Sequence, residues 1–511
     1  MYRRPLFYLI VISALIRLLL ASVLELGNDE VYYYTYGQHL QINYFDHPPG
    51  IALLIKLFTF NMHFKAEVFV RLGSIFCAAI GTLLIFKIGT FIKNKRTGWI
   101  AALLYNTSIY CSIIAGTFIL PDSPQVIFWL LSLLIIFIII DKYDCQRPVA
   151  NSWWIIFGIA NGLCIMCKIH GVFIWGGVGL FILFYKRDIL VKTGPYLAFI
   201  ITLLIISPIF WWNYHNHFIT YNYHSSRVGL NNFKIDKDSF LQTILGQIVY
   251  NSPLNVVVTV IGIFICFKRK LLHPDYLRLL LLCGVPIILV VTVMSLFNTV
   301  LPHWSGPGFL TLSLLGAVFI DDLKVKRSVI IIPTLIKWMI SFMLVLIISG
   351  IVFINFYPGT IGNTDKNKLG ENDFTLDMYG WGAFGKSFDD WYNEEVEHKN
   401  LQQGIRIVDN KWFPAAHIDY YVASPIDTYV IGMGEINDLH HYAWLNNYRG
   451  NLVKGDNALC IVPSNYPIDV NSYYLKYFSS IKPLSTFAQY RGGKICRYFR
   501  VYLLQNLLRN N

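Results

Sequence analysis

The chain has 511 residues, of which 55% are hydrophobic and only 14% are charged, and its mean hydropathy is +0.49. Soluble globular proteins carry about a quarter charged residues, so these values exclude an ordinary soluble protein and indicate a chain surrounded largely by lipid. The net charge of +12 does not indicate a nucleic-acid partner, because the Lys and Arg residues cluster in every second loop between apolar segments.

Apolar segments long enough to cross a bilayer recur from the N-terminus to about residue 354. The first segment lacks a small-residue cleavage site, so we interpret it as a retained span rather than a signal peptide. We predict an α-helical polytopic membrane protein with about eleven transmembrane helices, at residues 6–24, 67–92, 98–116, 122–140, 152–167, 171–185, 194–212, 245–266, 277–297, 304–320 and 329–354. The alternating basic loops then place the N-terminus in the cytoplasm and the C-terminus outside.

Two shorter segments are assigned by the same charge rule. Residues 50–60 are apolar but too short to span and contain Lys56, so we expect them to lie in the membrane interface. Residues 153–187 are read as two short spans around Lys168, because only two spans keep both flanking basic loops inside.

The composition changes near residue 355, after which the chain is polar and aromatic. Strand-like runs at 405–409, 427–432, 458–463 and 494–504 alternate with helix-like segments, which predicts a small external α/β domain. We therefore expect a membrane domain over 1–354, with a first external loop at 25–65, a linker at 357–374 and an external domain over 355–511. Cys460 and Cys496 fall in this domain and are either a disulfide or two free thiols.

Polar residues with no evident role in solubility lie on the predicted external side. The first loop carries Asp29, Glu30, Asp46 and His47, and the later external loops or span ends carry Asp122, Lys168, Arg227 and His303. The cytoplasmic loops, in contrast, are short and merely basic. This distribution predicts an active site at the external membrane boundary, built from several loops.

Each of these residues also has a purely structural interpretation. Asn28 or Asp29 could cap the helix that follows, and Asp122 could cap the fourth span. His47 could be a turn residue, whereas Lys168 and Arg71 could extend from helix ends toward water.

The aromatic and imidazole side chains of the external loops are equally open to two readings. Tyrosines 32, 33, 34 and 36 fit an interfacial belt that could also stack on a substrate. Histidines 215, 217 and 224 suggest a metal site only weakly, and a loop surface is the favoured reading.

The stretch DEVYYYTYGQHLQINYFDHPPGIALLI at residues 29–55 resembles the first-loop signature of bacterial GT-C superfamily glycosyltransferases of the family 39/83 type. That group includes protein O-mannosyltransferases and lipid A aminoarabinose transferases. The resemblance continues through VRLGS (70–74), GTFILPDSPQVIFW (116–129), GLCIMCKIHGV (162–172), PIFWWNYHNHFITYNYH (208–224) and LPHWSGPGFLTL (301–312). It implies a GT-C-like membrane fold over most of the chain.

The resemblance implies an enzyme that takes a sugar from a polyprenyl-phosphate carrier and inverts its anomeric centre. Asp29 fills the position of the general base, with Glu30 beside it, and Asp122 matches a second recurrent carboxylate. The residues expected to hold the carrier phosphate are Lys168, Arg71, His47, Arg227 and His303, and those expected to support the first loop are Asp46 and Tyr33. His47 stands where the lipid A transferases have a lysine, so its charge at neutral pH is an open question.

Residue chemistry fits the same reaction, because a carboxylate can accept the acceptor proton and cations can stabilise the departing phosphate. The predicted partners are a polyprenyl-phosphate-linked sugar donor, a lipid, glycan or protein acceptor and the lipids of the plasma membrane. No cofactor is certain; a divalent metal ion bridging Asp46 and a loop histidine is compatible but not indicated. A transporter or lipid-linked saccharide flippase is the alternative, although it should show mid-span ionisable residues and inverted repeats. A catalytically inactive scaffold is a third hypothesis.

Overall fold

The computed structural model describes residues 2–228, 235–323 and 332–509, and the chain divides into two compact units. The first unit comprises residues 1–21 and 40–345, and the second comprises residues 22–39 and 346–511. The predicted division of the chain between residues 354 and 355 stays a prediction. Residues 329–331, the start of the last predicted span, lie outside the described residues.

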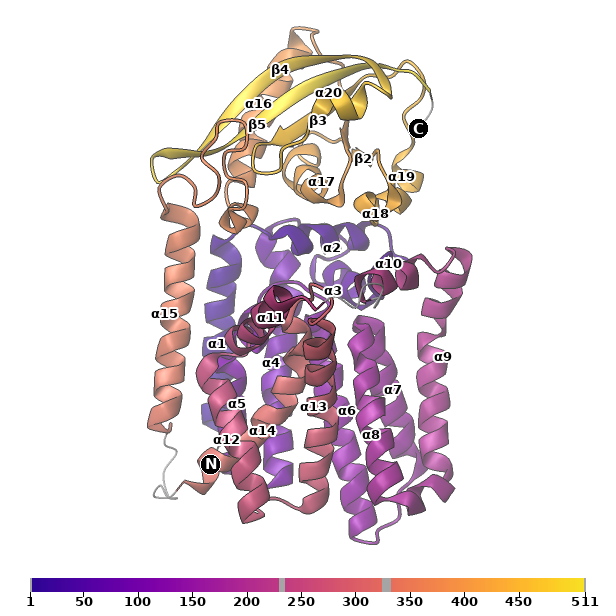
Figure 1. The fold of residues 1–511 in the computed structure, drawn as a ribbon, viewed down its shortest axis with the longest axis vertical. Helices are drawn as coiled ribbons and strands as arrows, with labels where there is room; N and C mark the ends of the chain where they lie inside the picture. The colour runs from indigo at the N-terminus through magenta and orange to yellow at the C-terminus, as the bar shows by residue number, and fades with distance from the viewer. Residues whose placement is uncertain (1, 229–234, 324–331, 510–511) are drawn as a thin grey trace. The chain divides into compact units, whose positions relative to one another are not determined.

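The first unit is a bundle of helices (Figure 1). Seven helices of the described chain are long and apolar enough to cross a membrane, or eight if one bent pair counts as a single span. Its principal helices are α1 (Arg3–Val23), α4 (Glu67–Ile92), α5 (Lys95–Thr107), α6 (Asp122–Asp144), α7 (Asn151–Cys167), α8 (Val172–Tyr185), α9 (Thr193–His215), α11 (Lys237–Tyr250), α12 (Pro253–Arg269), α13 (Pro274–Met294) and α14 (Gly306–Asp322). The residues of α15 (Thr334–Phe356) are divided between the two units, at residue 345.

The polytopic helical architecture predicted from the sequence is confirmed, and each predicted span has a helical counterpart. The two short spans expected around Lys168 correspond to α7 and α8, helices of 17 and 14 residues. The interfacial segment forms α3 (Gly50–Phe58), a helix of nine residues. The span expected at 98–116 consists of α5 and a short π-helix of five residues, η1 (Tyr110–Ile114).

The span predicted at 245–266 is bent, because α11 and α12 meet at an angle of 92°. Pro253 opens α12, and Ser252 just before it has a left-handed φ of 65°, which breaks the helix. The Ser252 hydroxyl donates to the Thr107 carbonyl at 2.8 Å and accepts from the Ile109 amide at 3.1 Å. The bend is therefore fixed against the end of α5.

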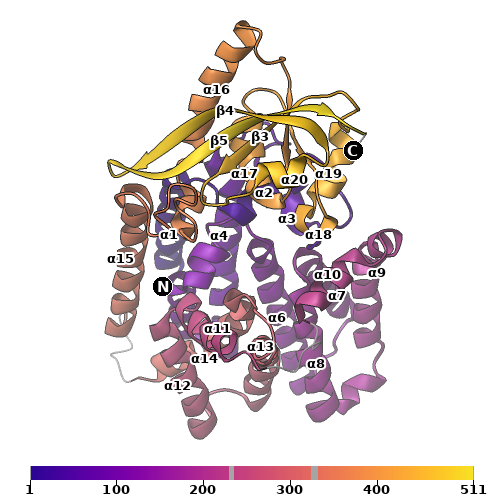
Figure 2. The same ribbon diagram turned by 45° about the horizontal axis from the view of Figure 1, so that its top comes forward.

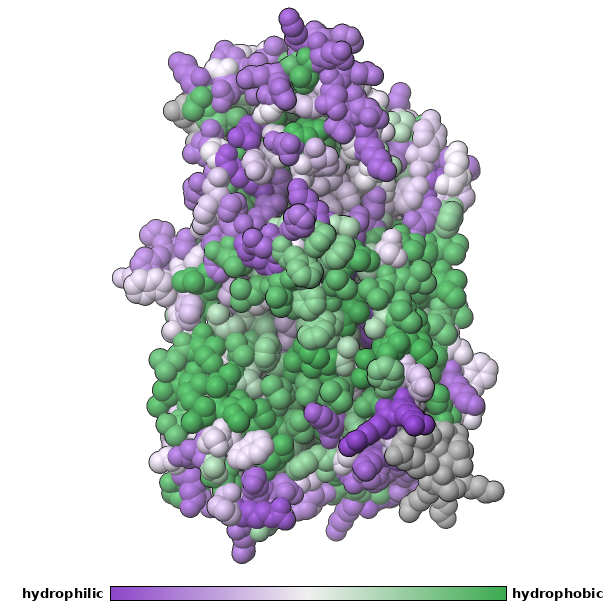
Figure 3. All heavy atoms as spheres, turned by 180° about the vertical axis from the view of Figure 1, so that it is seen from behind, coloured by the Kyte–Doolittle hydropathy of each residue, from purple (hydrophilic) through white to green (hydrophobic). Residues whose placement is uncertain are grey.

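The outer surface of the helices is apolar. Figure 3 shows a broad hydrophobic area over the helices, with polar side chains gathered below it at the foot of the view. Large side chains such as Leu204 and Phe264 are 66% and 69% exposed, which a water-soluble bundle would not tolerate over so wide an area. The protein is thus a multi-pass membrane protein.

Helices α7 and α9 pack closely because glycines line their contact. A Cβ atom at Gly158 would lie 2.4 Å from the Ala198 carbonyl oxygen, and one at Gly162 would lie 2.9 Å from Cβ of Ile205. The Thr202 hydroxyl donates to the Gly158 carbonyl across the same contact at 3.0 Å. Small residues four apart are the usual basis for such close helix packing in lipid.

The second unit contains a five-stranded mixed sheet in the order β2-β1-β3-β5-β4 (Figure 2). Strand β1 (Arg406–Asp409) pairs in parallel with β2 (Val430–Gly432) and β3 (Ala458–Pro463), whereas β5 (Lys494–Leu507) is antiparallel to β3 and β4 (Phe478–Arg491). The predicted α/β domain is confirmed, but its longest edge strand, β4, was not predicted. Strand β4 is largely exposed and contains Pro483, so it lacks the apolar run by which buried strands are found.

The sheet is accompanied by α16 (Trp381–Glu397), α17 (Trp412–Ile418), α18 (Ile436–Leu439), α19 (Tyr442–Arg449) and α20 (Val470–Tyr474). Helix α17 packs against β1, β2 and α2 (Asn28–Gln38), which belongs to this unit. The Glu25 carboxylate accepts hydrogen bonds from the Trp381 and Gly382 amides at 2.7 and 2.8 Å, which satisfies the N-terminus of α16. The segment 22–39 is thereby fastened to residues of the C-terminal part.

The tyrosines of α2 do not form the predicted interfacial belt. Tyr32, Tyr33, Tyr34 and Tyr36 are all buried within the second unit. The Tyr32 ring contacts Trp412, the Tyr34 ring contacts Tyr420 and the Tyr36 ring contacts His441, with centroids 4.8–4.9 Å apart. The tyrosine-rich run is therefore a packing surface, because its rings are covered by aromatic residues far along the chain.

The predicted linker contains no helix or strand before η5 (Phe374–Met378), yet it is firmly held. The buried Asp373 carboxylate accepts from Arg491 at 2.8 Å, from the Thr360 hydroxyl at 2.7 Å and from the Ile361 amide at 3.1 Å. Cys460 and Cys496 are free thiols, so the disulfide alternative is wrong.

Replacing Gly158 by Leu should force α7 and α9 apart, because the added side chain has no space beside Ala198. We expect a loss of about 1–3 kcal/mol of stability and a lower thermal midpoint in detergent. Gly176→Leu on α8 is the matched control, since nothing lies within 4 Å of a Cβ at that position. Equal midpoints for the two variants would contradict this packing account.

Candidate active site

The centre of the predicted site in the first unit is a buried ion pair. The Lys168 ammonium lies 2.7 Å from Oδ2 of Asp122, and the two side chains are 3% and 2% exposed. Asp122 is the first residue of α6, and Lys168 directly follows α7. Charges this deeply buried are costly unless they are paired. The folded helices place Asp122 and Lys168 next to each other inside the bundle, so each charge has its partner.

Neighbouring polar groups complete the surroundings of this pair. The Tyr110 hydroxyl of η1 donates to Oδ1 of Asp122 at 2.9 Å. The Gln125 amide donates to the Lys168 carbonyl at 3.1 Å, which joins α6 to the end of α7. Tyr110 and Gln125 were not among the predicted site residues, because each lies in an apolar run with no motif that links it to Asp122.

His47 lies at the same site, in the turn that follows α2. The turn is closed by a hydrogen bond from the Tyr44 amide to the His47 carbonyl at 3.1 Å. Burial lowers the pKa of His47 to about 4; the Asp46 and Asp122 carboxylates raise it, whereas Lys168 and His224 lower it. His47 is therefore a neutral imidazole at pH 7, in contrast to the lysine expected at this position by the resemblance.

Two further loops reach this group. His303 of η4 (Pro302–Ser305) is close enough to interact electrostatically with Asp122, Lys168 and His47. The Nε2 atom of His224, in α10 (Ile219–Val228), is 3.0 Å from the Asp46 carbonyl oxygen. The ring centroids of His224 and His47 are 6.4 Å apart. The structure thus brings together Asp46, His47, Asp122, Lys168 and His303 from segments distant in the sequence.

The two predicted arginines have other surroundings. Arg71 is fully buried in α4, donates to the Ala21 carbonyl at 3.2 Å and lies 5.4 Å from the Phe118 ring centroid. The alternative that Arg71 and Lys168 extend from helix ends toward water is therefore wrong, because both side chains are buried. Arg227 belongs to α10, but its side chain lies outside the described residues.

The predicted carboxylates of α2 belong to the second unit. The Glu30 carboxylate accepts from the Gly27 amide at 2.9 Å, so Glu30 caps its own helix. Asn28 donates to Oδ2 of Asp377 at 2.9 Å, and Tyr33 is buried among the other tyrosines. Asp29 is exposed. The role of general base predicted for Asp29 requires such exposure, because an incoming hydroxyl must reach the carboxylate.

A cluster of carboxylate and imidazole groups other than Asp46 and the loop histidines lies at the ends of helices. Among the described residues, a group able to hold a metal ion consists of Asp144, His273 and Asp275, none of which was predicted. Lys186 lies 3.0 Å from the Asp275 carboxylate and also pairs with Asp144, while Arg278 lies 2.8 Å from Asp275. These cations already neutralise both carboxylates, which marks the group as an ion-pair network joining helix ends.

The comparisons with known proteins agree with this architecture. The sequence model of the dolichyl-phosphate-mannose-protein mannosyltransferase family matches residues 46–212. The chain is 20% identical over 297 residues to the lipid A galacturonosyltransferase RgtD of Rhizobium johnstonii, a match that covers 58% of this chain and 60% of that relative.

Two solved structures share the fold over nearly the whole chain. The structure of ArnT from Cupriavidus metallidurans in the apo state matches this chain with a TM-score of 0.64 at 11% sequence identity. The structure of the same protein bound to undecaprenyl phosphate matches with a TM-score of 0.62 at 13% sequence identity. Each comparison covers 97% of both chains. Such a likeness, at this identity, establishes the fold.

Breaking the central ion pair should destabilise the protein more than breaking an exposed one. Asp122→Asn and Lys168→Met should each cost about 3–5 kcal/mol, because each leaves one charge buried without its partner. The double variant should lose less than the sum of the two single losses. Asp322→Asn, which breaks the partly exposed 2.8 Å pair with Arg269, should cost about 1 kcal/mol or less. Additive losses at Asp122 and Lys168 would show that the two are not coupled.

His47 should make the fold sensitive to mild acid. Its folded pKa of about 4 is below its ordinary value, so the unfolded chain binds a proton first as pH falls below about 6.5. Stability from this group is complete above pH 6.5 and is lost as the pH falls toward 4. His47→Gln should flatten the fall of the thermal midpoint across this range, whereas His215→Gln, at an exposed position, should not. An unchanged profile for His47→Gln would contradict the neutral imidazole.

Proposed function

We propose that the chain is a glycosyltransferase of the GT-C superfamily and that it moves a sugar from a polyprenyl-phosphate carrier to an acceptor hydroxyl. ArnT, which has the same fold, has been solved with undecaprenyl phosphate bound, and this supports a polyprenyl-phosphate carrier. RgtD acts on lipid A, so a lipid-linked saccharide is one acceptor class alongside glycans and proteins.

The observation that carries the proposal is the buried Lys168 ammonium beside Asp122 in an apolar helical bundle. An ammonium has three N–H donors, and the Asp122 carboxylate is the partner of one of them at 2.7 Å. Lys168 is therefore the residue proposed to bind the phosphate of the carrier. Asp122, itself held by Tyr110, fixes the position of the ammonium in this proposal.

The histidines give this site polarity without permanent charge. His47 is neutral at pH 7 and can donate one ring N–H to a phosphate oxygen. An arriving phosphate would favour the protonated ring and raise the pKa of His47. His303, close to the same ion pair, is proposed to contribute in the same way, and Arg71 and Arg227 remain the further candidates.

The proposed reaction breaks the bond between the anomeric carbon and the phosphate oxygen, and the phosphate leaves with the electron pair. The acceptor oxygen attacks the opposite face of the sugar, which inverts the anomeric centre, and Asp29 accepts the hydroxyl proton. Positive charge develops on the sugar and negative charge on the phosphate, as in oxocarbenium-like transition states. Lys168 stabilises the second of these charges. We place this chemistry at the external face of the plasma membrane, with the N-terminus cytoplasmic.

The proposal is tested by mass analysis of envelope lipids, glycans and proteins from cells with and without the gene. The wild type should add one sugar mass to one of these classes. Asp29→Asn should lower the modified fraction at least about 100-fold at an unchanged level of folded membrane protein, because a general base contributes about 10²–10⁴ in rate. Asp390→Asn, an exposed aspartate of α16, is the matched control and should transfer normally.

Normal transfer by Asp29→Asn would exclude Asp29 as the base while leaving the transferase in place. Wild-type cells with no sugar-dependent mass change would reject the transferase and favour a transporter or an inactive scaffold.

A further inference from the structure

The second unit contains a cavity of about 670 Å³ that takes no part in the chemistry proposed above. Its walls come from the turn after β1, the end of β3, the segment 370–377 and α20. Pockets that hold small molecules measure roughly 300–1,000 Å³, so the cavity is large enough for one or two sugar rings. All of its lining residues belong to the second unit.

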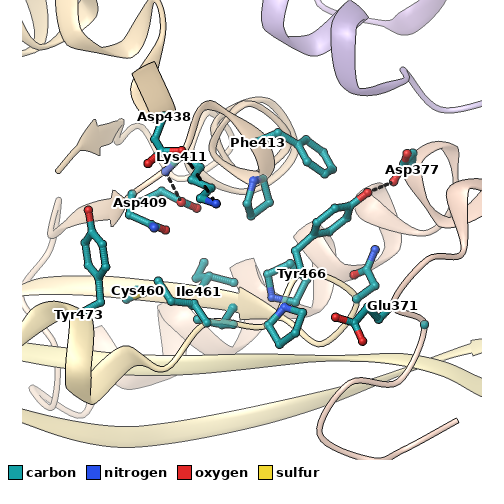
Figure 4. A pocket seen from close by; sticks show the side chains of 18 of the residues that line it. Glu371, Asp377, Asp409, Lys411, Phe413, Asp438, Cys460, Ile461, Tyr466 and Tyr473 are labelled. Carbon is teal, nitrogen blue, oxygen red and sulfur yellow. Dashed lines mark hydrogen bonds and ion pairs between the residues drawn. The ribbon is translucent and has the colours of Figure 1, made fainter. Parts of the chain in front are cut away.

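Aromatic side chains provide the apolar surface of this cavity. Figure 4 shows Phe413 and Tyr466 beside one another, with Tyr473 at the other side of the cavity. The Phe413 and Tyr466 rings contact edge to face at 4.4 Å, which fixes both of them. Rigid aromatic faces with a polar tip suit the C–H-bearing face of a pyranose.

Carboxylates lie at both ends of the cavity. Figure 4 shows Asp409 and Asp438 with Lys411 at one end, and Glu371 and Asp377 at the other. Burial raises the pKa of Asp409 to about 7 and that of Asp377 to about 6, so each can donate as well as accept a hydrogen bond near neutral pH. Five acidic residues line the cavity against one lysine, and those that are ionised would repel a phosphate or a carboxylate.

Asn465 provides an independent indication of a ligand. Its side chain lines the cavity and is 3% exposed, and neither its amide nitrogen nor its amide oxygen has a hydrogen-bond partner in the structure. A buried amide left without partners costs about 1–3 kcal/mol, and such a group is retained where a ligand satisfies it. An amide supplies both a donor and an acceptor, the pair of functions that a sugar hydroxyl matches.

We propose that this cavity binds a saccharide that carries no anionic group, with Asn465 bonding to its hydroxyls and the carboxylates excluding acidic sugars. The proposal does not depend on the transferase activity, because binding is measured without turnover.

The test is saturation-transfer NMR on the full-length protein in nanodiscs, with methyl galactoside, methyl glucosaminide and methyl galacturonide as separate probes. The neutral and amino sugars should receive saturation, and the acidic sugar should receive about tenfold less, as charge exclusion of about 1.4 kcal/mol implies. Methylguanidinium is included as a cation with neither hydroxyls nor a carboxylate and should give no comparable signal.

Asn465→Ala should abolish transfer to the galactoside while the unliganded protein melts at the same or a higher temperature, because an unsatisfied buried group has been removed. Asn400→Ala, at an exposed turn of the same unit, is the matched control. At pH 8, where Asp409 is ionised, Asp409→Asn should raise the galacturonide signal toward that of the galactoside, which keeps the proposal testable even where Asn465→Ala folds poorly.

Three results would overturn the proposal. They are equal transfer to all three sugars, a methylguanidinium signal equal to that of the glucosaminide, and unchanged galactoside binding in folded Asn465→Ala protein.

Discussion

The pairing of Lys168 with Asp122 is the interaction on which the site in the helical unit depends. Two charges almost completely removed from water gain little net stability from each other, since their desolvation offsets much of their attraction. A well-packed apolar pair would fill the same space at similar free energy. The pair is therefore better explained by what the ammonium can bind than by what it contributes to folding.

The rest of the helical unit holds that ammonium in place. Lys168 stands at the break between α7 and α8, where the chain leaves the helix in an extended conformation. Tyr110 comes from the short π-helix after α5, and the bend before α12 is bonded to the end of α5 through Ser252. The irregular backbone of this unit thus lies where polar groups must converge, as expected of membrane proteins whose non-helical segments are buried in protein.

Much of the fold follows from the sequence because hydropathy and loop charge are local signals. The spans, the two short helices around Lys168 and four of the five strands are predictable in this way. Pro253 is a local signal for a break before α12, but the bend is fixed by hydrogen bonds of Ser252 with Thr107 and Ile109, which are far away along the chain. Strand β4 was missed for a related reason, since its pairing with β5 rather than its own composition makes it a strand.

The candidate site, like the fold, was predictable from the sequence only in part. Asp122, Lys168, His47 and His303 were each identified from position and residue type, but their meeting is a tertiary property that no spacing reveals. The first-loop motif is divided in function: Glu30 caps α2, the tyrosines pack within the second unit, and Asp46 and His47 form a turn held by α10. Sequence alone could not separate these uses, because helix caps, packing aromatics and catalytic residues draw on the same residue types.

The central claim is that Lys168 receives the phosphate of a polyprenyl carrier. A structure of the full-length protein in nanodiscs with undecaprenyl phosphate tests it most directly. The account predicts phosphate density within about 3 Å of the Lys168 ammonium, as for a charge-assisted hydrogen bond. Phosphate bound elsewhere, with Lys168 still engaged only by Asp122, would contradict it.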